Sequence, residues 1–530
     1  MIKKEKATKL RSAAFQRGSA LRLSKYPGSF SIGLIRQYFP KRTDFGKVAF
    51  LPWNLAKNNA YLDWNTTKTG PFLPWNLAMS KRIIDFHLDR WKIDPFRKPL
   101  LLRGARQVGK TYAARRLGRQ FKSFVEINFE RLEGAASIFE KDLAPQRLIL
   151  ALSLLAKTPI IPGETLLFFD EVQEAPRAIL ALRYFYEEMP NLHLIAAGSL
   201  LEFAIAKVGV PVGRISMFYM YPFSFLEYLV AIGHHLIAKE ILDHPVGVPM
   251  EEVIHLKILD LLGEYLSIGG MPEAVARWIQ TKDPALVLNV LQQIAATYRQ
   301  DFEKYARKAQ VKYLEQLFRQ MPHLVGKDFS YREIHGEYRK RELAPALELL
   351  ERANIIHSIR HSSGQGIPIG AEVDFETFKV IYLDIGLCQA ILGSDVSDWF
   401  LRPLEAFENR GEIAEGFIGQ ELICYASPDN KAESYFWKRK EKNSAAEIDY
   451  LIQRGDQIVP IEVKSGHGNT LRSLHIFLET HPKSNSAIRF SSLNYSMINK
   501  LDSRPLYAAA SLAHPNQKEA LIRLVHGGPD

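Results

Sequence analysis

Four short apolar runs, each followed by polar or glycine-rich residues, mark the chain between residues 98 and 199. They are Lys98–Arg103, Ser123–Asn128, Glu164–Glu171 and His193–Ser199. Apolar runs of this length are typical of strands that are buried on both faces of a parallel sheet. Helically spaced apolar residues in Ser80–Trp91, and again after Thr111, predict helices beside them. We therefore expect an α/β fold with a parallel sheet.

The first apolar run leads into GARQVGKT, which fits the phosphate-loop pattern G-x-x-x-x-G-K-[ST] at every fixed position. The predicted strand before it and helix after it are the context that the pattern requires. In such a loop, backbone N–H groups cradle phosphate oxygens at the positive end of a helix dipole. Lys110 would reach the β- and γ-phosphates, and Thr111 would hold Mg²⁺. The predicted ATP-binding residues are Gly104, Ala105, Arg106, Gln107, Val108, Gly109, Lys110 and Thr111, together with Ser199.

Adjacent carboxylates end the third run. We expect Asp170 to hold Mg²⁺ with Thr111, and Glu171 to orient and activate the attacking water. Ser199 ends the fourth run, either as a γ-phosphate sensor or as an ordinary strand-ending residue. Arg214 either supplies positive charge to the transferring phosphate, in its own chain or across a subunit boundary, or is a surface residue. The predicted activity is Mg²⁺-dependent ATP hydrolysis, with Glu171, Lys110 and Arg214 as catalytic candidates.

Four segments together resemble the AAA-type ATPases of bacteria and archaea that carry a nuclease-like C-terminal module. They are RGARQVGKT, LLFFDEVQEAP, AAGS and VGR followed by YPFSFLEYL. The resemblance covers about residues 80–510, and it implies a P-loop ATPase that uses ATP and Mg²⁺. We expect an ATPase domain over 79–228, a helical lid over 229–308, a winged-helix segment over 309–382, a nuclease-like α/β domain over 383–510 and a tail over 511–530.

A winged helix-turn-helix is predicted within residues 309–382. Its helices would be Val311–Met321, Phe329–His335 and Arg341–Ala353, followed by a wing over Ile355–Val380. Such a unit can place its third helix in a DNA major groove, or it can pack between domains. The basic residues Lys340, Arg341 and Arg352 are too few to decide between these roles.

A second chemical constellation lies near the C-terminus. Asp449 precedes Glu462 by thirteen residues, and strand alternation sends Glu462 and Lys464 to one face. Two carboxylates and a lysine at a hairpin can hold Mg²⁺ and position water for phosphodiester attack. The pattern resembles the PD-(D/E)XK nuclease core, which belongs to the restriction-endonuclease-like α/β fold, and the resemblance makes Glu421 the matching helical acid. Either the site is an active metal site, or the residues are kept for structure without activity.

Composition changes this picture only at the N-terminus. Residues 1–78 contain fourteen Lys or Arg and three acids, so they account for the whole net charge of +11. They also repeat FLPWNLA at 50–56 and 72–78. This segment is either a basic arm that contacts nucleic acid or acidic lipid, or an extension without a fold that precedes a start at Met79. Charge therefore does not argue that the folded body binds nucleic acid.

For the remaining chain, the sequence predicts a cytoplasmic ATPase without a membrane span. No run of 18 apolar residues occurs, and Cys388 and Cys424 show no metal-binding spacing. The predicted function is ATP hydrolysis coupled to the nuclease-like domain, with DNA as a candidate target. The alternative is a slow ATP-dependent switch with an inactive nuclease-like interaction domain. Beyond ATP, we expect a homo-oligomer or a protein partner.

Overall fold

The computed structural model describes residues 81–209, 211–394, 400, 403, 405–406, 410–439, 446–464 and 471–527. All of them belong to the compact unit Phe72–Asp530. The predicted basic extension over 1–78, including both copies of the repeat, lies outside the described residues.

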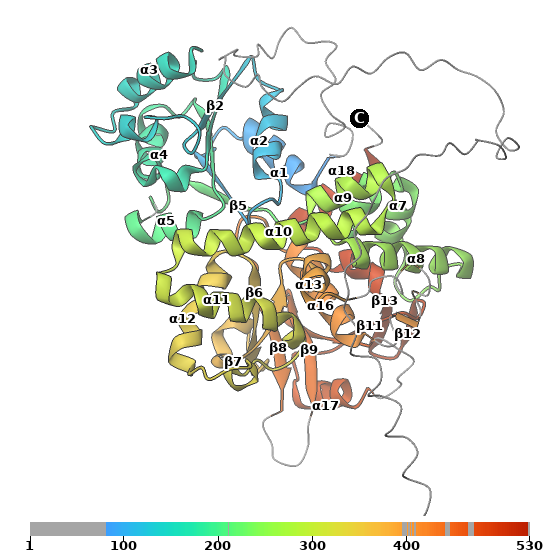
Figure 1. The fold of residues 1–530 in the computed structure, drawn as a ribbon. Coiled ribbons are helices and arrows are strands. Elements are labelled where there is room, and N and C mark those ends of the chain that lie inside the picture. Colours follow the sequence, from blue (N-terminus) through green and yellow to red (C-terminus); the bar gives the residue numbers. More distant parts are fainter. Residues whose placement is uncertain are drawn as a thin grey trace, which may run out of the picture. The chain divides into compact units, whose positions relative to one another are not determined.

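The first sheet confirms the parallel α/β arrangement (Figure 1). Its five strands are all parallel and lie in the order β2-β3-β4-β1-β5. The strands are β1 (Leu100–Arg103), β2 (Ser123–Asn128), β3 (Thr165–Asp170), β4 (His193–Ala197) and β5 (Ser216–Tyr219). The helices and 3-10 turns that accompany them are α1 (Ile83–Ile93), α2 (Lys110–Gly118), η2 (Ala136–Phe139), α3 (Pro145–Ala156), η3 (Val172–Glu174), α4 (Pro176–Glu188) and α5 (Leu201–Val208).

Alternation along the strands divides the first sheet's side chains between two hydrophobic cores. Leu100 and Leu102 join the core that also contains α1 and α2, whereas Leu101 joins the core beneath α4. Phe168 and Phe169 on β3 divide in the same way, and both are fully buried. Burying one large apolar side chain contributes about 1.5–3 kcal/mol, which explains why these strands are apolar throughout rather than on alternate positions.

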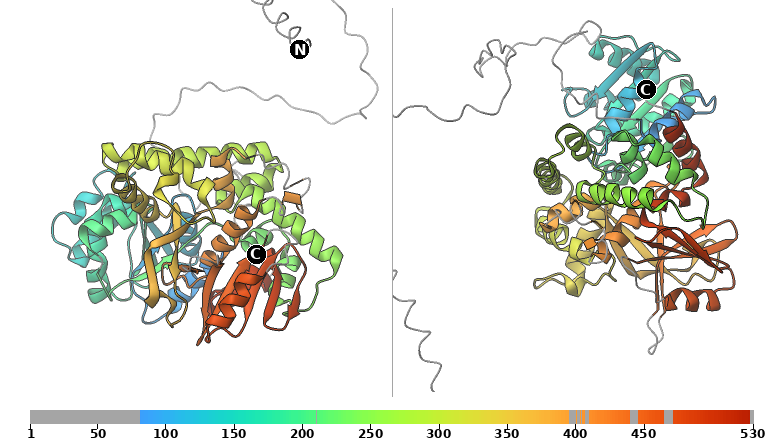
Figure 2. Two further views of the ribbon diagram at one scale, coloured as in Figure 1. Left: turned by 90° about the horizontal axis from the view of Figure 1, so that it is seen from below. Right: turned by 90° about the vertical axis from the view of Figure 1, so that its right-hand side faces the viewer.

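A helical region follows the first sheet. It comprises α6 (Phe225–Ala231), α7 (His235–Asp243), α8 (Glu252–Ile268), α9 (Pro272–Thr281) and α10 (Pro284–Tyr305). The 22 residues of α10 make it about 33 Å long. Figure 1 shows α10 between the elements of the first sheet and those of the second, and Figure 2 gives two further views of the fold.

The first and third predicted helices are present, but the predicted second helix is only a three-residue 3-10 turn, and the predicted wing is not a separate hairpin. The elements are α11 (Lys308–Gln320), η4 (Met321–Leu324), η5 (Tyr331–Glu333) and α12 (Lys340–Arg352), then β6 (Ile356–Ser362), η6 (Ile369–Glu372) and β7 (Val373–Tyr382). Strand β6 pairs with β7 on one side and in parallel with β8 on the other. The boundary predicted at 382/383 therefore cuts through one continuous sheet.

This second sheet has eight strands in the order β12-β13-β11-β10-β9-β8-β6-β7. Its remaining strands are β8 (Ser434–Lys438), β9 (Glu447–Arg454), β10 (Gln457–Val463), β11 (Ala487–Ser491), β12 (Ser496–Ile498) and β13 (Leu501–Pro505). The accompanying helices are α13 (Ile385–Leu392), α16 (Gly411–Cys424), α17 (Arg472–Thr480), η7 (Leu506–Leu512) and α18 (Pro515–His526).

The predicted tail over 511–530 contains a helix with a structural role. This helix is α18. Its Gln517 Oε1 lies 2.6 Å from Nε2 of the His87 ring on α1, and both residues are buried. The apolar residues Leu521 and Leu524 of α18 are part of the main hydrophobic core. In the described part of the chain, no helix is long and apolar enough to cross a membrane.

Candidate functional site

The predicted phosphate loop connects the carboxyl end of β1 to the first turn of α2. Gly104 has a φ of 138°, and a Cβ there would lie 2.2 Å from the Met220 carbonyl oxygen. Only glycine fits, because both the backbone conformation and the space exclude a side chain. Gly109, at the N-cap of α2, also has a positive φ of 101°. The loop thus leaves the backbone N–H groups at the start of α2 available to an anion, the arrangement that cradles phosphates.

Lys110 points back into the loop. Its Nζ donates to the carbonyl oxygens of Gly104 at 2.9 Å and Ala105 at 2.7 Å, and the residue is 8% exposed. Burial lowers the pKa of Lys110 to about 8, and the carboxylates of Glu171 and Asp170 oppose this shift. The ammonium is thus held by neutral carbonyls that a phosphate could replace with a stronger, charge-assisted interaction.

Thr111 and Asp170 meet as the sequence predicts. The Thr111 hydroxyl lies 3.2 Å from both carboxylate oxygens of Asp170, and the Asn128 amide donates to the same carboxylate at 3.2 Å. Burial, and then the neighbouring Glu171 carboxylate, raise the pKa of Asp170. A hydroxyl and a carboxylate beside a phosphate site are oxygen donors that suit Mg²⁺, which usually completes its shell with phosphate and water. These residues fit the ion.

Glu171 adopts a left-handed backbone conformation, with a φ of 50°, immediately after β3. Gln173 donates to its carboxylate at 2.7 Å, and the Ser199 hydroxyl lies 3.5 Å from the same oxygen. A non-glycine residue in this region is strained by about 1–3 kcal/mol, and such strain concentrates at functional sites. The structure therefore brings the predicted Glu171 and Ser199 together. It adds Gln173, which the DEVQE run contains but which sequence reasoning did not select.

Helix α10 contacts the phosphate loop directly, which sequence reasoning also missed. Arg106 Nη1 donates to Asp301 Oδ1 at 2.8 Å and Oδ2 at 2.6 Å, and the Tyr298 hydroxyl donates to the Arg106 carbonyl at 2.6 Å. Gln107, next in the loop, has a left-handed φ of 64°. Tyr298 and Asp301, which follow Arg106 by 192 and 195 residues in the sequence, therefore hold one side of the loop in place.

Arg214 does not reach the phosphate site of its own chain, so its predicted role there is corrected. Strand β5 lies parallel to β1 with Ser216 opposite Leu100, which puts Arg214 before the amino end of β5. The phosphate loop follows the carboxyl end of β1. Arg214 instead pairs with Glu187 at 2.9 Å on the exposed surface. Its role across a subunit boundary stays a prediction.

A second cluster of charged side chains lies on the second sheet, where the nuclease-like residues were predicted. Lys379 on β7 points into it with a side chain only 1% exposed. Its Nζ lies 2.9 Å from Glu415 Oε1 and 3.7 Å from Asp449 Oδ1, and it also contacts Glu447. Glu462 on β10 pairs with Lys464, which directly follows that strand. Asp449 and Glu462 therefore lie on the paired antiparallel strands β9 and β10, and Lys464 follows the second of them.

Glu421 is not part of this cluster, and that prediction is corrected. It accepts a hydrogen bond from the Phe225 N–H at 3.0 Å, and burial raises its pKa to about 8. The carboxylate that α16 contributes to the cluster is Glu415. Six helical residues correspond to about 600° of rotation, so Glu415 and Glu421 lie on different faces. Because α16 is buried around most of its circumference, its sequence does not indicate which face meets the hairpin.

The cluster holds its charges out of water. Burial alone would lower the pKa of Lys379, but the carboxylates of Glu415, Asp449 and Glu447 outweigh it and raise the pKa above its ordinary value. Burial raises the pKa of Glu415, Asp449 and Glu462. Among the described residues, no three His, Cys, Asp or Glu side chains are arranged to hold a metal ion.

Two of the three basic residues considered for DNA contact are engaged with acids. Lys340 pairs with Glu376 on β7, and Arg352 pairs with Glu348 on its own helix at 2.6 Å. These pairs reduce the positive charge that α12 could offer to a phosphate backbone. DNA recognition by α12 stays a prediction.

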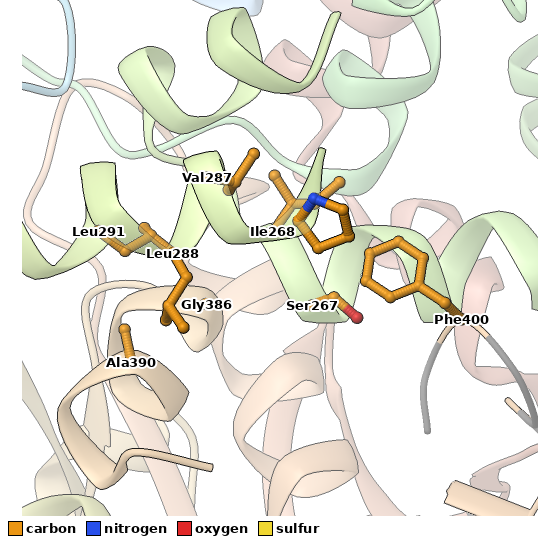
Figure 3. Close-up of a pocket in the computed structure, with 9 residues that line it drawn as sticks. Ser267, Ile268, Val287, Leu288, Leu291, Gly386, Ala390 and Phe400 are labelled. Carbon is orange, nitrogen blue, oxygen red and sulfur yellow. The ribbon is translucent and has the colours of Figure 1, made fainter. Parts of the chain in front are cut away.

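An apolar pocket beside α10 belongs to neither charged site. It lies between α8, α10 and α13, and Figure 3 shows Ser267 as the one labelled residue with a side-chain oxygen among apolar neighbours. Val287, Leu288 and Leu291 line it from the amino-terminal half of α10, whereas Asp301 contacts the phosphate loop from the other half. None of the described residues that line the pocket is charged.

Comparison with known families covers three segments of the chain. Residues 96–229 match a model described as "AAA domain", which contains the phosphate loop, Asp170 and Glu171. These residues are therefore similar to AAA domains, and the match supports ATP binding and hydrolysis. Residues 259–398 and 410–504 match two domains of unknown function, DUF8612 and DUF4143. No curated protein matches the chain significantly.

Two solved structures illustrate distant similarities. The Walker-type ATPase PABY2304 of Pyrococcus abyssi is 16% identical, with 58% of this chain and 94% of that chain covered and a TM-score of 0.38. The Aeropyrum pernix ORC1 protein in complex with DNA is 15% identical, with 61% and 95% covered and a TM-score of 0.29. TM-scores this low carry no argument about activity or partners.

Proposed function

We propose that this chain is a Mg²⁺-dependent ATPase whose nucleotide state is transmitted to the C-terminal sheet through α10. The observation that carries the proposal is the convergence of Lys110, Thr111, Asp170 and Glu171 at one edge of a parallel sheet. Nucleotides bind at the carboxyl ends of such strands. A buried lysine, a hydroxyl–carboxylate pair and an oriented second carboxylate are the groups that phosphoryl transfer to water requires.

Each group has a distinct task in this proposal. Lys110 leaves the loop carbonyls and neutralises the β- and γ-phosphates, while Thr111 and Asp170 hold Mg²⁺. Glu171 orients the attacking water and accepts its proton as the bond to the γ-phosphorus forms and ADP leaves. Gln173 and Ser199 keep the Glu171 carboxylate in place.

Separating binding from turnover tests this assignment. Lys110→Ala should lose both nucleotide binding and hydrolysis, whereas Glu171→Gln should bind ATP and hydrolyse it at least about 100-fold more slowly. The matched control is Lys122→Ala, because Lys122 is a lysine of the same domain with a 75% exposed side chain. A normal hydrolysis rate in Lys110→Ala would refute the proposal.

For the C-terminal sheet we propose an interaction role governed by nucleotide state rather than phosphodiester cleavage. Lys379 supports this choice, because its ammonium lies among the carboxylates that a nuclease would use for Mg²⁺. Metal-assisted cleavage needs that position for the ion. We therefore derive no nuclease step from these residues.

The test is incubation of the full chain with plasmid DNA, Mg²⁺ or Mn²⁺, with and without ATP. We expect the plasmid to stay intact under every condition. Cleavage that disappears in Glu462→Gln would instead support the ATP-coupled nuclease.

A further inference from the structure

We propose that Lys379 is the resident cation of the carboxylate cluster, and that removing its ammonium opens a binding site for Mg²⁺ or Mn²⁺. The cluster consists of Lys379, Glu415, Glu447, Asp449 and Glu462. The inference deepens the proposed non-nucleolytic role of the C-terminal sheet. It does not depend on ATP hydrolysis, since none of its residues belongs to the phosphate site.

The side chains of the cluster come from four different elements, with Glu462 supplied by β10. Glu447 and Asp449 are alternate residues of β9 and therefore share a face of the sheet. Glu415 comes from α16, which covers that face, and Lys379 comes from β7. The convergence is tertiary, because Lys379 and Asp449 are separated by β8 and α16 along the chain.

The Lys379 ammonium occupies the place that a metal ion would need. Its Nζ is 2.9 Å from Glu415 Oε1, an ordinary distance for a charge-assisted hydrogen bond. Mg²⁺ requires oxygen ligands at about 2.0–2.1 Å in a near-octahedral shell. An ion at that point would overlap the ammonium and be repelled by it. The wild-type cluster therefore already holds a cation at this point, which closes the position to a divalent ion.

One buried carboxylate oxygen of the cluster has no hydrogen-bond partner. Glu462 is 4% exposed, and its Oε2 has no hydrogen-bond partner although Oε1 is engaged by Lys464. Asp449 Oδ2 accepts the Val463 N–H at 2.7 Å, which leaves Oδ1 facing Lys379. Without the ammonium, Glu415, Asp449 and Glu462 would present buried carboxylate oxygens, the ligands that Mg²⁺ and Mn²⁺ prefer.

A neighbouring lysine provides a matched control. Lys438 also approaches Glu447, at 3.6 Å, but its side chain is 38% exposed and pairs with Asp328. Lys438→Met removes the same charge and nearly the same length of side chain from the rim of the cluster. It should not create a cation site, because Lys379 stays in place.

The experiment compares Mn²⁺ binding by the nucleotide-free full chain, measured by electron paramagnetic resonance. The variants are Lys379→Met, Lys438→Met and the double variant Lys379→Met/Asp449→Asn. Metal ligands must be deprotonated and burial raises the pKa of Glu415, so the titration is made at about pH 8. We expect an additional Mn²⁺ site in Lys379→Met that is absent from wild type, from Lys438→Met and from the double variant. Mn²⁺ should also raise the melting temperature of Lys379→Met alone.

Removing one partner of a buried ion pair can prevent folding. ATP turnover reports folding independently of the cluster, and Lys379→Met/Glu447→Gln removes one of the uncompensated charges if the single variant fails. Wild-type Mn²⁺ binding that is lost in Asp449→Asn would overturn the inference. A folded Lys379 variant that binds no more Mn²⁺ than Lys438→Met would overturn it too. Neither result bears on the ATPase proposal, which stands or falls with Lys110 and Glu171.

Discussion

Lys110 carries its positive charge in a desolvated loop, and that placement makes phosphate binding sensitive to pH. Burial lowers the pKa of Lys110 to about 8, so the free protein loses this charge as the pH rises through that value. A phosphate favours the protonated lysine, because opposite charges stabilise each other in a site screened from water. Nucleotide binding and lysine protonation are therefore coupled.

We expect the dissociation constant for ATP to increase as the pH rises from about 7 to about 9, by about tenfold per unit once the lysine is deprotonated. A fluorescent ATP analogue titrated at fixed ionic strength measures this. Lys110→Arg is the control, since a guanidinium keeps its charge throughout this range. If its affinity fell with pH as steeply as that of wild type, another group would be responsible.

At the scale of single elements, α10 contacts the phosphate loop with one half and lines the apolar pocket with the other. Asp301 is 5% exposed and receives both hydrogen bonds from Arg106, the third residue of the phosphate loop. Leaving a buried charged group without its partner costs about 1–3 kcal/mol or more. The Arg106–Asp301 pair thus stabilises the loop conformation that presents its N–H groups to phosphate.

We expect Asp301→Asn to lower the melting temperature and to reduce kcat/KM for ATP by about tenfold, which corresponds to about 1.4 kcal/mol. Steady-state ATP hydrolysis and thermal unfolding measure the two effects. Glu303→Gln removes the same charge from an exposed position two residues along the same helix, and it should change neither. Equal behaviour of the two variants would show that Asp301 has no special link to the loop.

The helices and strands also show which features of the fold and the site could be predicted from the sequence. GARQVGKT and the apolar run that ends in Asp170 are local patterns whose chemistry follows from adjacent residues. The strand, the loop and the Thr111–Asp170 pair could therefore be predicted from the sequence. Glu415 and Lys379 could not. Because α16 is buried on most sides, its sequence does not indicate which of its faces meets the sheet. The pattern of residues along β7 likewise does not indicate that Lys379 contacts β9. The wing strands likewise join the second sheet through pairing with β8, a contact that sequence periodicity does not encode.

At the scale of the whole unit, hydrogen bonds and one apolar contact region connect the phosphate loop to the second sheet. The amino-terminal half of α10 lines the apolar pocket with α13 (Figure 3). The first residue of α13, Ile385, donates its N–H to Gln420 of α16 at 2.8 Å, and α16 carries Glu415. Buried Asp384 joins the same region by accepting the Gly270 N–H at 2.6 Å. A contiguous set of contacts of this kind can carry coupling, but the coupling itself has to be measured.

Hydrogen exchange of the Glu171→Gln variant, with and without ATP and Mg²⁺, measures that coupling. We expect ATP to slow exchange in the phosphate loop and also along α10 and α13, because an ordered loop holds Asp301 and Tyr298 in place. Adding Asp301→Asn should leave the protection of the loop but remove most of it from α10 and α13. Adding Glu303→Gln instead should preserve both. If α13 stays unprotected even with Asp301 intact, nucleotide binding is confined to the first sheet, and the C-terminal sheet does not respond to it through this helix.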